Sequence, residues 1–315
     1  MIKYETNTDQ ITQVRPLSDD ISDVTIHPRE NAIYVANQSD KLIERYDLET
    51  LEKNREFTLT DRGDSVTPES VAAGLEGRIM VHSRLEGLFL IDSDSGQVLD
   101  TLRHPGAQSG QGVFSNDGLR FFSHRYGQTS SPNLTAYDVV DDSLSFSNFL
   151  SFPASPETPA IFLSQDGSSL FWRKQFFNLD LEPQGMSADG EILITASAFG
   201  DFYSTTRGFF KREDDSPLID YPFEATLQAI SRDHTKIYLA AGNQLEVVNL
   251  KEIDGLAPPR HYSRNSRQFG STRAATRIVL GHRPIGFGLP SLPGPDPGGR
   301  RKCQSGKQRI PRPND

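Results

Sequence analysis

The clearest candidates for chemistry are cationic and aromatic side chains that follow three neighbouring apolar segments of the chain. They are His82, Arg84, His124, Arg125, Tyr126, Trp172, Arg173 and Lys174. Imidazole and guanidinium groups bind carboxylates and phosphates, and aromatic rings can cover a ligand or hold a cation. If the three segments lie side by side, these residues predict a binding rim for a protein or a small anionic ligand. The alternative is ordinary solvated loops, neutralised by acids such as Glu86 and Asp201.

Other sequence patterns typical of metal-binding, phosphate-binding or catalytic sites are absent. The seven histidines show neither HxxxH nor HExxH spacing, so no helical zinc site is expected. There is no Gly-rich phosphate loop, no GxSxG nucleophile turn and no EF-hand. We therefore expect no catalytic residue, no metal and no cofactor; only a metal site assembled from separate segments would escape this search.

A short pattern recurs along the chain: a Ser-like residue, any residue, Asp, Gly, two variable residues and two apolar residues. It occurs at residues 115–122, 164–171 and 187–194, and more loosely at 27–34, 74–81 and 231–238. Asp-Gly favours a tight turn, because Gly adopts positive φ freely. The pattern thus predicts hairpins, with turn roles for Asp117, Asp166, Asp189, His27 and His234.

Short segments rich in β-branched and aromatic residues flank most copies of the pattern, and they predict strands on both sides of each turn. The entering segments are DVTI, SVAA, GVF, AIFL and LQAI, and the leaving ones are AIYVA, RIMVH, LRFFS, SLFWR, EILITA and KIYLAA. Third strands follow in most copies, as at 41–48 and 87–92, and fourth strands are predicted at 55–59 and 98–102. No helix pattern occurs.

The spacing of the copies predicts an all-β protein, a β-propeller of about six four-stranded blades. Most gaps between copies suit a blade of roughly 40–50 residues. The gap of 23 residues between 164 and 187 does not. We favour a shortened blade there, and the alternative is that one of the two matches is accidental. A seven-bladed ring with a missing blade is the alternative architecture.

Residues 23–59, DVTIHPRENAIYVANQSDKLIERYDLETLEKNREFTL, resemble a repeat of the YVTN and WD-repeat propeller proteins. IYVAN is the signature strand, His27 and Pro28 form the preceding turn, and Asp47 closes the third strand. Residues 87–102 repeat the later half. The resemblance covers roughly residues 10–254 and weakens at 164–184. It implies the propeller fold but no function, because such propellers include lactonases, dehydrogenases and binding platforms.

The two ends of the repeat array have separate predicted roles. Residues 12–17 are expected to complete the last blade, with an unclosed ring as the rival. Residues 258–315 hold 12 Lys and Arg, 2 Asp and Glu, 9 Pro and 8 Gly. We therefore predict a propeller domain over residues 1–257 and a disordered basic Pro/Gly/Arg-rich tail over 258–315. Three interpretations of the tail stay open: a solvated extension, a basic arm for nucleic acid or an acidic partner, and an out-of-frame translation.

Composition also bears on compartment and function. The start of the chain lacks a signal-peptide pattern, no long apolar run occurs, and Cys303 is the single cysteine. We expect a cytoplasmic protein away from membranes, with export possible if the true N-terminus lies upstream. Residues 1–257 carry 21 Lys and Arg against 40 Asp and Glu, which disfavours nucleic acid except at the tail.

The function favoured by the sequence is a non-enzymatic binding or protein-interaction module. One alternative is a lactonase-like hydrolase or an oxidoreductase with His82, Arg84, His124 and Arg125 at its central channel. The other is a truncated or frameshifted propeller without independent function.

Overall fold

In the computed structural model, almost all of the described residues precede residue 251. It describes residues 1–5, 10–18, 20–83, 85–103, 109–126, 133–152, 161–164, 166–187, 193–196, 201–221, 223–224, 227–230, 235–241, 244–250 and 276–279. The chain divides into two units, Met1–Gly281 and His282–Asp315, and the second lies wholly outside the described residues. Within the described part of the chain, no helix has the length and hydropathy needed to cross a membrane.

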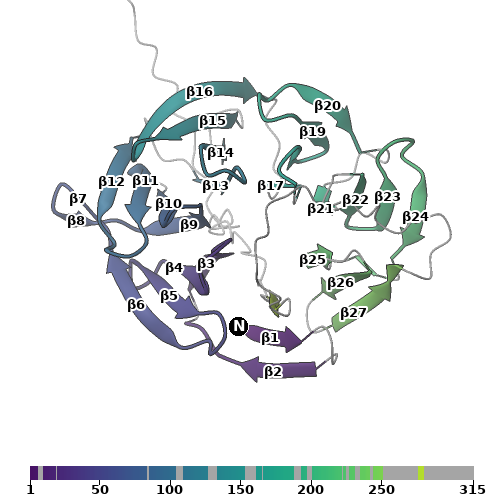
Figure 1. Cartoon of the computed structure of the whole chain (residues 1–315), viewed down its shortest axis with the longest axis horizontal. Helices are drawn as coiled ribbons and strands as arrows, with labels where there is room; N and C mark the ends of the chain where they lie inside the picture. Colours follow the sequence, from purple (N-terminus) through teal and green to yellow (C-terminus); the bar gives the residue numbers. More distant parts are fainter. Residues whose placement is uncertain are drawn as a thin grey trace, which may run out of the picture. The chain divides into compact units, whose positions relative to one another are not determined.

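The described strands form eight antiparallel sheets, and seven of them are set radially around a centre, which confirms the predicted propeller (Figure 1). Blade 1 is β3 (Ile21–Ile26), β4 (Ala32–Asn37), β5 (Leu42–Asp47) and β6 (Lys53–Thr58). Blade 2 is β9 (Pro68–Ala73), β10 (Arg78–Ser83), β11 (Gly87–Asp92) and β12 (Val98–Leu102). Blade 3 is β13 (Ser109–Phe114), β14 (Arg120–Tyr126), β15 (Asn133–Val140) and β16 (Ser143–Ser151).

The second half of the ring has shorter strands. Blade 4 is β17 (Ile161–Leu163), β18 (Leu170–Trp172), β19 (Gln175–Phe177) and β20 (Pro183–Met186). Blade 5 is β21 (Leu193–Ala196), β22 (Phe202–Thr205), β23 (Gly208–Lys211) and β24 (Pro217–Asp220). Blade 6 has three described strands, β25 (Leu227–Ile230), β26 (Lys236–Ala241) and β27 (Gln244–Asn249). A two-stranded hairpin, β7 (Thr60–Asp61) and β8 (Asp64–Ser65), lies in the connection between blades 1 and 2.

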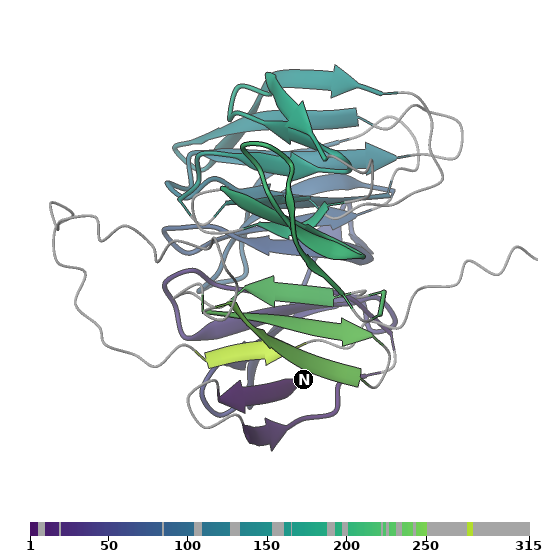
Figure 2. The ribbon, with the colours of Figure 1, turned by 90° about the vertical axis from the view of Figure 1, so that its right-hand side faces the viewer.

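The remaining sheet joins segments that are far apart in the sequence. It is ordered β2 (Gln10–Val14), β1 (Ile2–Glu5) and β28 (Thr276–Val279), and Figure 2 shows β28 beside β1. The prediction that residues 12–17 supply a fourth strand to the last blade is wrong, because β2 pairs with β1. β28 lies within residues 258–315, for which a disordered tail was predicted, and the other residues of that stretch lie outside the described residues.

The 23-residue gap between two copies of the turn pattern has a simple explanation. Blade 4 keeps four strands, but three of them are only 3 residues long. Ser187 follows β20 and precedes β21, so its copy of the pattern lies between blades rather than between a first and a second strand. The blade is therefore shortened, as predicted, and the match at 187 is also accidental. EILITA contributes the first strand of blade 5, not the second.

The predicted turns are confirmed where the structure describes them. In blade 3, Ser115 Oγ donates to Asp117 Oδ1 (2.5 Å) and accepts the backbone N–H of Arg120 (2.9 Å), while Gly118 has a φ of 75°. Ser164 and Asp166 repeat this arrangement in blade 4. In blade 1 the same position is His27, whose Nδ1 accepts the backbone N–H of Glu30 at 2.8 Å. Asp189 and His234 lie outside the described residues.

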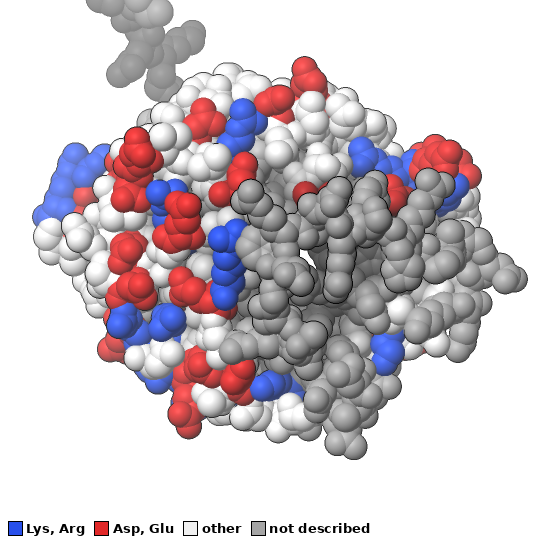
Figure 3. Space-filling model, in the orientation of Figure 1, with Lys and Arg blue, Asp and Glu red and all other residues white. Residues whose placement is uncertain are grey.

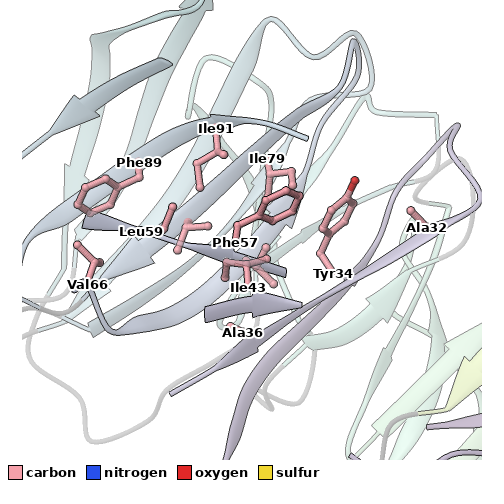
Figure 4. Packing of buried hydrophobic residues seen from close by; sticks show 12 residues of the cluster. Ala32, Tyr34, Ala36, Ile43, Phe57, Leu59, Val66, Ile79, Phe89 and Ile91 are labelled. Carbon is pink, nitrogen blue, oxygen red and sulfur yellow. The ribbon is translucent and has the colours of Figure 1, made fainter. Parts of the chain in front are cut away.

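The hydrophobic core is divided among the junctions between neighbouring blades. Between blades 1 and 2, Tyr34 and Ile43 face Ile79 and Phe89, all of them fully buried (Figure 4). Similar clusters fill the junctions from blade 2 through blade 6. Met1 packs against Ile33 and Val35 of blade 1, so the start of the chain joins this arrangement. Neighbouring blades thus cover both faces of a sheet, which explains why every residue of β4 is buried.

Polar contacts link neighbouring blades at four successive junctions, and they lie at equivalent positions of each blade. In each, a residue at or just before the second strand contacts the turn between the third and fourth strands of the next blade. The pairs are Glu30 and Ser93 (3.2 Å), Arg78 and Asp142 (3.0 Å), Arg120 and Asp180 (2.8 Å), and Ser169 and Arg212 (3.0 Å). These contacts fix the blades relative to one another and so position the residues that each blade carries.

A β-bulge recurs at one register in all five four-stranded blades. In each of these blades, the fourth and outermost strand has one extra residue, which lies opposite the middle or the second half of the third strand. The extra residues are Asn54, Leu99, Ser147, Gln184 and Leu218. A bulge bends its strand and reverses the side to which the following side chains point. This reversal matters most in blade 3.

Candidate functional site

The predicted rim residues fall into three groups in the structure. His82 on β10, His124 on β14 and Trp172 on β18 are buried, with only 1%, 2% and 1% of their surface exposed. For these three the prediction of an exposed rim is wrong. Arg173 and Lys174 follow β18 and are partly exposed. Arg84 lies outside the described residues, as do the side chains of Arg125 and Tyr126.

The burial of the two histidines follows from their place in the blades. His82 and His124 occupy the second strands of blades 2 and 3, and each second strand is paired on both sides. The neighbouring blade then covers the face of the sheet. A position near the end of a strand is therefore not a position on the surface, although the sequence pattern alone treats the two as equivalent.

Five residues of blades 2 to 4 come together as what we call the inner cluster. Its members are Glu69, His82, His124, Trp172 and Arg173. Glu69 is on β9, beside β10, and its Oε2 lies 3.6 Å from His82 Nδ1. The imidazole of His124 lies 6.0 Å from the indole of Trp172, centroid to centroid. Arg173 Cζ lies 5.5 Å from the centroid of the same indole.

The electrostatics of the inner cluster keep His124 neutral. Burial is the main cause that lowers the pKa of His124, and the nearby charges of His82 and Arg173 add to it, so that the pKa is about 3. A neutral imidazole donates one hydrogen bond and accepts one. Trp172 Nε1 is buried and has no hydrogen-bond partner among the described residues. The cluster is therefore rich in N–H donors, and Glu69 supplies its one carboxylate.

The chemistry open to the inner cluster is recognition of a negatively charged or hydrogen-bond-accepting group. Guanidinium, imidazole and indole N–H groups all suit such a ligand. Within the described part of the chain, no three His, Cys, Asp or Glu side chains are placed to hold a metal ion. Glu69 could not be singled out from the sequence, because it lies on β9, the strand before the one that carries the histidine it contacts.

A second unusual surface lies on the outside of blade 3, where β16 is the outermost strand (Figure 1). Phe146 and Phe149 are 59% and 54% exposed, and their ring centroids are 6.0 Å apart. We call them the outer aromatic pair. Residues three apart on a regular strand point to opposite sides. The bulge at Ser147 removes that difference and brings both rings to one side.

The packing of β16 confirms this reversal. Leu144, before the bulge, packs into the junction of blades 2 and 3, whereas Leu150, after it, packs into the junction of blades 3 and 4. β16 itself carries no charged residue, but Asp141 and Asp142 precede it. The sequence SLSFSNFLS was not singled out as a site. Its signal was an uncharged strand whose two phenylalanines break the expected alternation.

The surroundings of these two places are acidic. Figure 3 shows Asp and Glu side chains spread over the face of the first three blades, with Lys and Arg among them. Some arginines of these blades are paired with acids: Arg78 contacts Asp142, and Arg120 contacts Asp180 and Asp138. Such a surface favours partners with basic residues near the contact.

Comparison with known proteins identifies the fold and not the function. No family model matches the chain, and no curated protein sequence matches it. Hydrazine synthase from Kuenenia stuttgartiensis is similar in structure, with a TM-score of 0.59 and 11% identity over 79% of this chain and 88% of that chain. A chain in a crystal structure of a mitotic checkpoint complex has a TM-score of 0.57 and 14% identity over 79% and 83%. In total, 1143 solved chains match. At these low identities the likeness shows the fold alone, a β-propeller, which serves many functions.

Proposed function

We propose that this protein is a non-enzymatic protein-interaction module and that the outer aromatic pair is its main contact surface. The observation that carries the proposal is the exposure of Phe146 and Phe149, together, on the outer strand of blade 3. Single exposed apolar residues are common on proteins, but two adjacent exposed aromatic rings on an uncharged strand are not. Phenylalanine is enriched at protein interfaces.

The energy available at this surface suits recognition of a partner. Burying one exposed phenylalanine contributes about 1.5–3 kcal/mol, so the pair can supply a large part of a moderate affinity. The rings are held on a blade that is fixed to its neighbours by the Arg78–Asp142 and Arg120–Asp180 contacts. A contact surface that is already rigid loses little entropy on binding.

The chemistry around the pair indicates the kind of partner. Asp141 is exposed at the start of β16, and residues 1–257 carry an excess of acidic side chains. The favoured partner is therefore an apolar segment of another protein with Lys or Arg at its flank. The bulge at Ser147 interrupts regular backbone pairing along β16. Recognition is thus expected through side chains rather than through an added strand.

The presence of a propeller in the mitotic checkpoint complex is compatible with this function, since that structure contains several proteins by its name. At 14% identity it adds no evidence about the surface used. The proposal rests on the residues of β16.

A displayed library of random peptides tests the proposal directly. Peptides are selected against the full chain and then measured against Phe146→Ser/Phe149→Ser. We expect the selected peptides to contain apolar residues flanked by Lys or Arg and to bind the double variant at least tenfold more weakly. The control is Leu119→Ser, since Leu119 is 51% exposed on the same blade but away from β16. Peptides that bind wild type and the double variant equally would contradict the assignment.

A further inference from the structure

We propose that the inner cluster is a second, independent binding site, which takes an oxyanion of a small molecule, either a carboxylate or a phosphate. It lies in blades 2 to 4 and shares no residue with the outer aromatic pair. The inference does not depend on the protein-interaction function, because it rests on a different set of contacts.

The first observation is the buried indole N–H of Trp172. The side chain is 1% exposed, and its Nε1 has no hydrogen-bond partner among the described residues. A buried donor without a partner is unfavourable, and native proteins rarely keep one without a reason. Phe152 packs edge-on against the indole at 4.7 Å and holds it in place. The N–H is thus a fixed donor for a group that accepts a hydrogen bond.

The second observation is the position of a cation beside this donor. Arg173 Cζ lies 5.5 Å from the centroid of the indole, and Arg173 is also one of the causes that lower the pKa of His124. Arg173 also has a φ of 58°, a left-handed conformation that is unfavourable for a residue with a side chain. The turn after β18 keeps the guanidinium above Trp172 in spite of this strain.

The third observation concerns charge balance. Arg173 is the permanent cation of the inner cluster, and its guanidinium can donate charge-assisted hydrogen bonds to an oxyanion. The charged and titratable groups around His124 are His82 on β10 and Arg173 after β18, with Glu69 on β9 next to His82. Because Glu69 adds a carboxylate to the cluster, the site suits a ligand with a single oxyanion rather than a polyanion.

Trp172 provides the means to test the site, because it is the single tryptophan of the chain. Its emission in the full chain is followed while sodium phosphate or sodium acetate is added at constant ionic strength, with sodium chloride as the reference salt. We expect a saturable change with at least one of the two anions and none with chloride. A response to phosphate alone, to acetate alone or to both assigns the ligand class.

Matched variants separate binding from a general salt effect. Arg173→Gln should weaken the response at least tenfold. Arg212→Gln should leave it unchanged, since Arg212 is also an arginine packed over an aromatic ring, 4.9 Å from Phe176, but lies outside the cluster. If Arg173→Gln does not fold, judged by circular dichroism, Arg173→Lys serves instead. The Phe146→Ser/Phe149→Ser variant should respond as wild type does, so that failure of one site is distinguishable from failure of the other.

The dependence on pH adds a second readout. Acetate keeps one negative charge between pH 6 and pH 8, so changes in its affinity report on the protein. Because the pKa of His124 is about 3, its imidazole stays neutral across this range, and the affinity for acetate should therefore change little between pH 6 and pH 8. No saturable response to either anion, or an equal response from Arg173→Gln, would overturn the proposal.

Discussion

The inner cluster and the outer aromatic pair reverse the usual distribution of side chains in opposite ways. Blade 3 contains part of each: His124 is polar and buried on β14, whereas Phe146 and Phe149 are apolar and exposed on β16. Buried polar side chains and exposed aromatic rings are both uncommon in folded proteins, since burial of a polar group costs free energy and an exposed ring remains in contact with water. The difference indicates two kinds of ligand, a small polar one inside and an apolar protein surface outside.

The largest expected effect is a difference in the free energy of unfolding between a variant of the inner cluster and a variant of the outer aromatic pair. Trp172→Ala removes a large buried side chain that packs against Phe152 and His124, and it should lower the free energy of unfolding by about 3–5 kcal/mol. Phe149→Ala should change it by less than about 0.5 kcal/mol because the ring is exposed. Denaturant unfolding of both variants measures this. Equal losses would show that the outer ring is part of the core and would break the comparison.

The next effect concerns acid. The pKa of His124 is about 3 in the folded protein, below its ordinary value of 6.5. The folded state therefore resists protonation, and its stability is complete above pH 6.5 and is lost as the pH falls toward 3. At pH 4.5 the loss should be about 2–3 kcal/mol. His124→Phe should abolish it, while removing oxyanion binding, as measured by melting temperature against pH for both proteins. A wild-type acid dependence that persists in the variant would refute this account.

A smaller effect is expected at Asp23, a polar group on the innermost strand of blade 1. Its carboxylate accepts the backbone N–H of Val24 (2.9 Å) and of Val71 on blade 2 (3.0 Å). Burial raises the pKa of Asp23 to about 7, against the opposing effect of these two hydrogen bonds.

The sign for Asp23 is opposite to that for His124. Because the folded pKa lies above the unfolded one, its contribution to stability is complete below pH 3.8 and is lost as the pH rises through 7. The side chain retains some solvent contact, so we expect about 2 kcal/mol between pH 4 and pH 8. Asp23→Asn should flatten this part of the stability profile, measured by urea unfolding at several pH values. A variant with the wild-type slope would assign the slope to other groups.

The smallest expected effect on stability concerns the outer aromatic pair. Phe146→Ser/Phe149→Ser should alter the free energy of unfolding by no more than about 0.5 kcal/mol, since both rings are exposed in the folded chain. Binding of a fluorescent hydrophobic dye to the folded protein should decrease in the same variant. Unchanged dye binding would place the accessible apolar surface elsewhere.

Local features were predictable from the sequence because their causes lie within a few residues. The Ser115–Asp117 turn and the turn role of His27 need only neighbours along the chain. The match at Ser187 shows the limit of such a pattern, since the same letters occur in a connection between two blades. A turn motif records how the chain bends and not which two strands it joins.

Features that depend on other blades were not predictable in the same way. His82 and His124 were expected at the surface, but adjoining strands and the neighbouring blade bury them. The pairing of β1 with β28 joins residues almost a whole chain apart. The outer aromatic pair depends on the bulge at Ser147, which leaves no mark on the composition of β16. In each case the decisive contact is long-range, and spacing along the sequence does not encode it.

The recurrent bulge of the outer strands has a consequence for the protein in a crowded solution. A radial array of sheets presents an unpaired backbone edge at the rim of every blade, and such edges are templates on which strands of other chains can stack into fibrils. One surplus residue at the same register of β6, β12, β16, β20 and β24 puts each of these five edges out of step with an incoming straight strand. The outer strands can thus remain accessible to binding partners while strand-to-strand association between molecules is disfavoured.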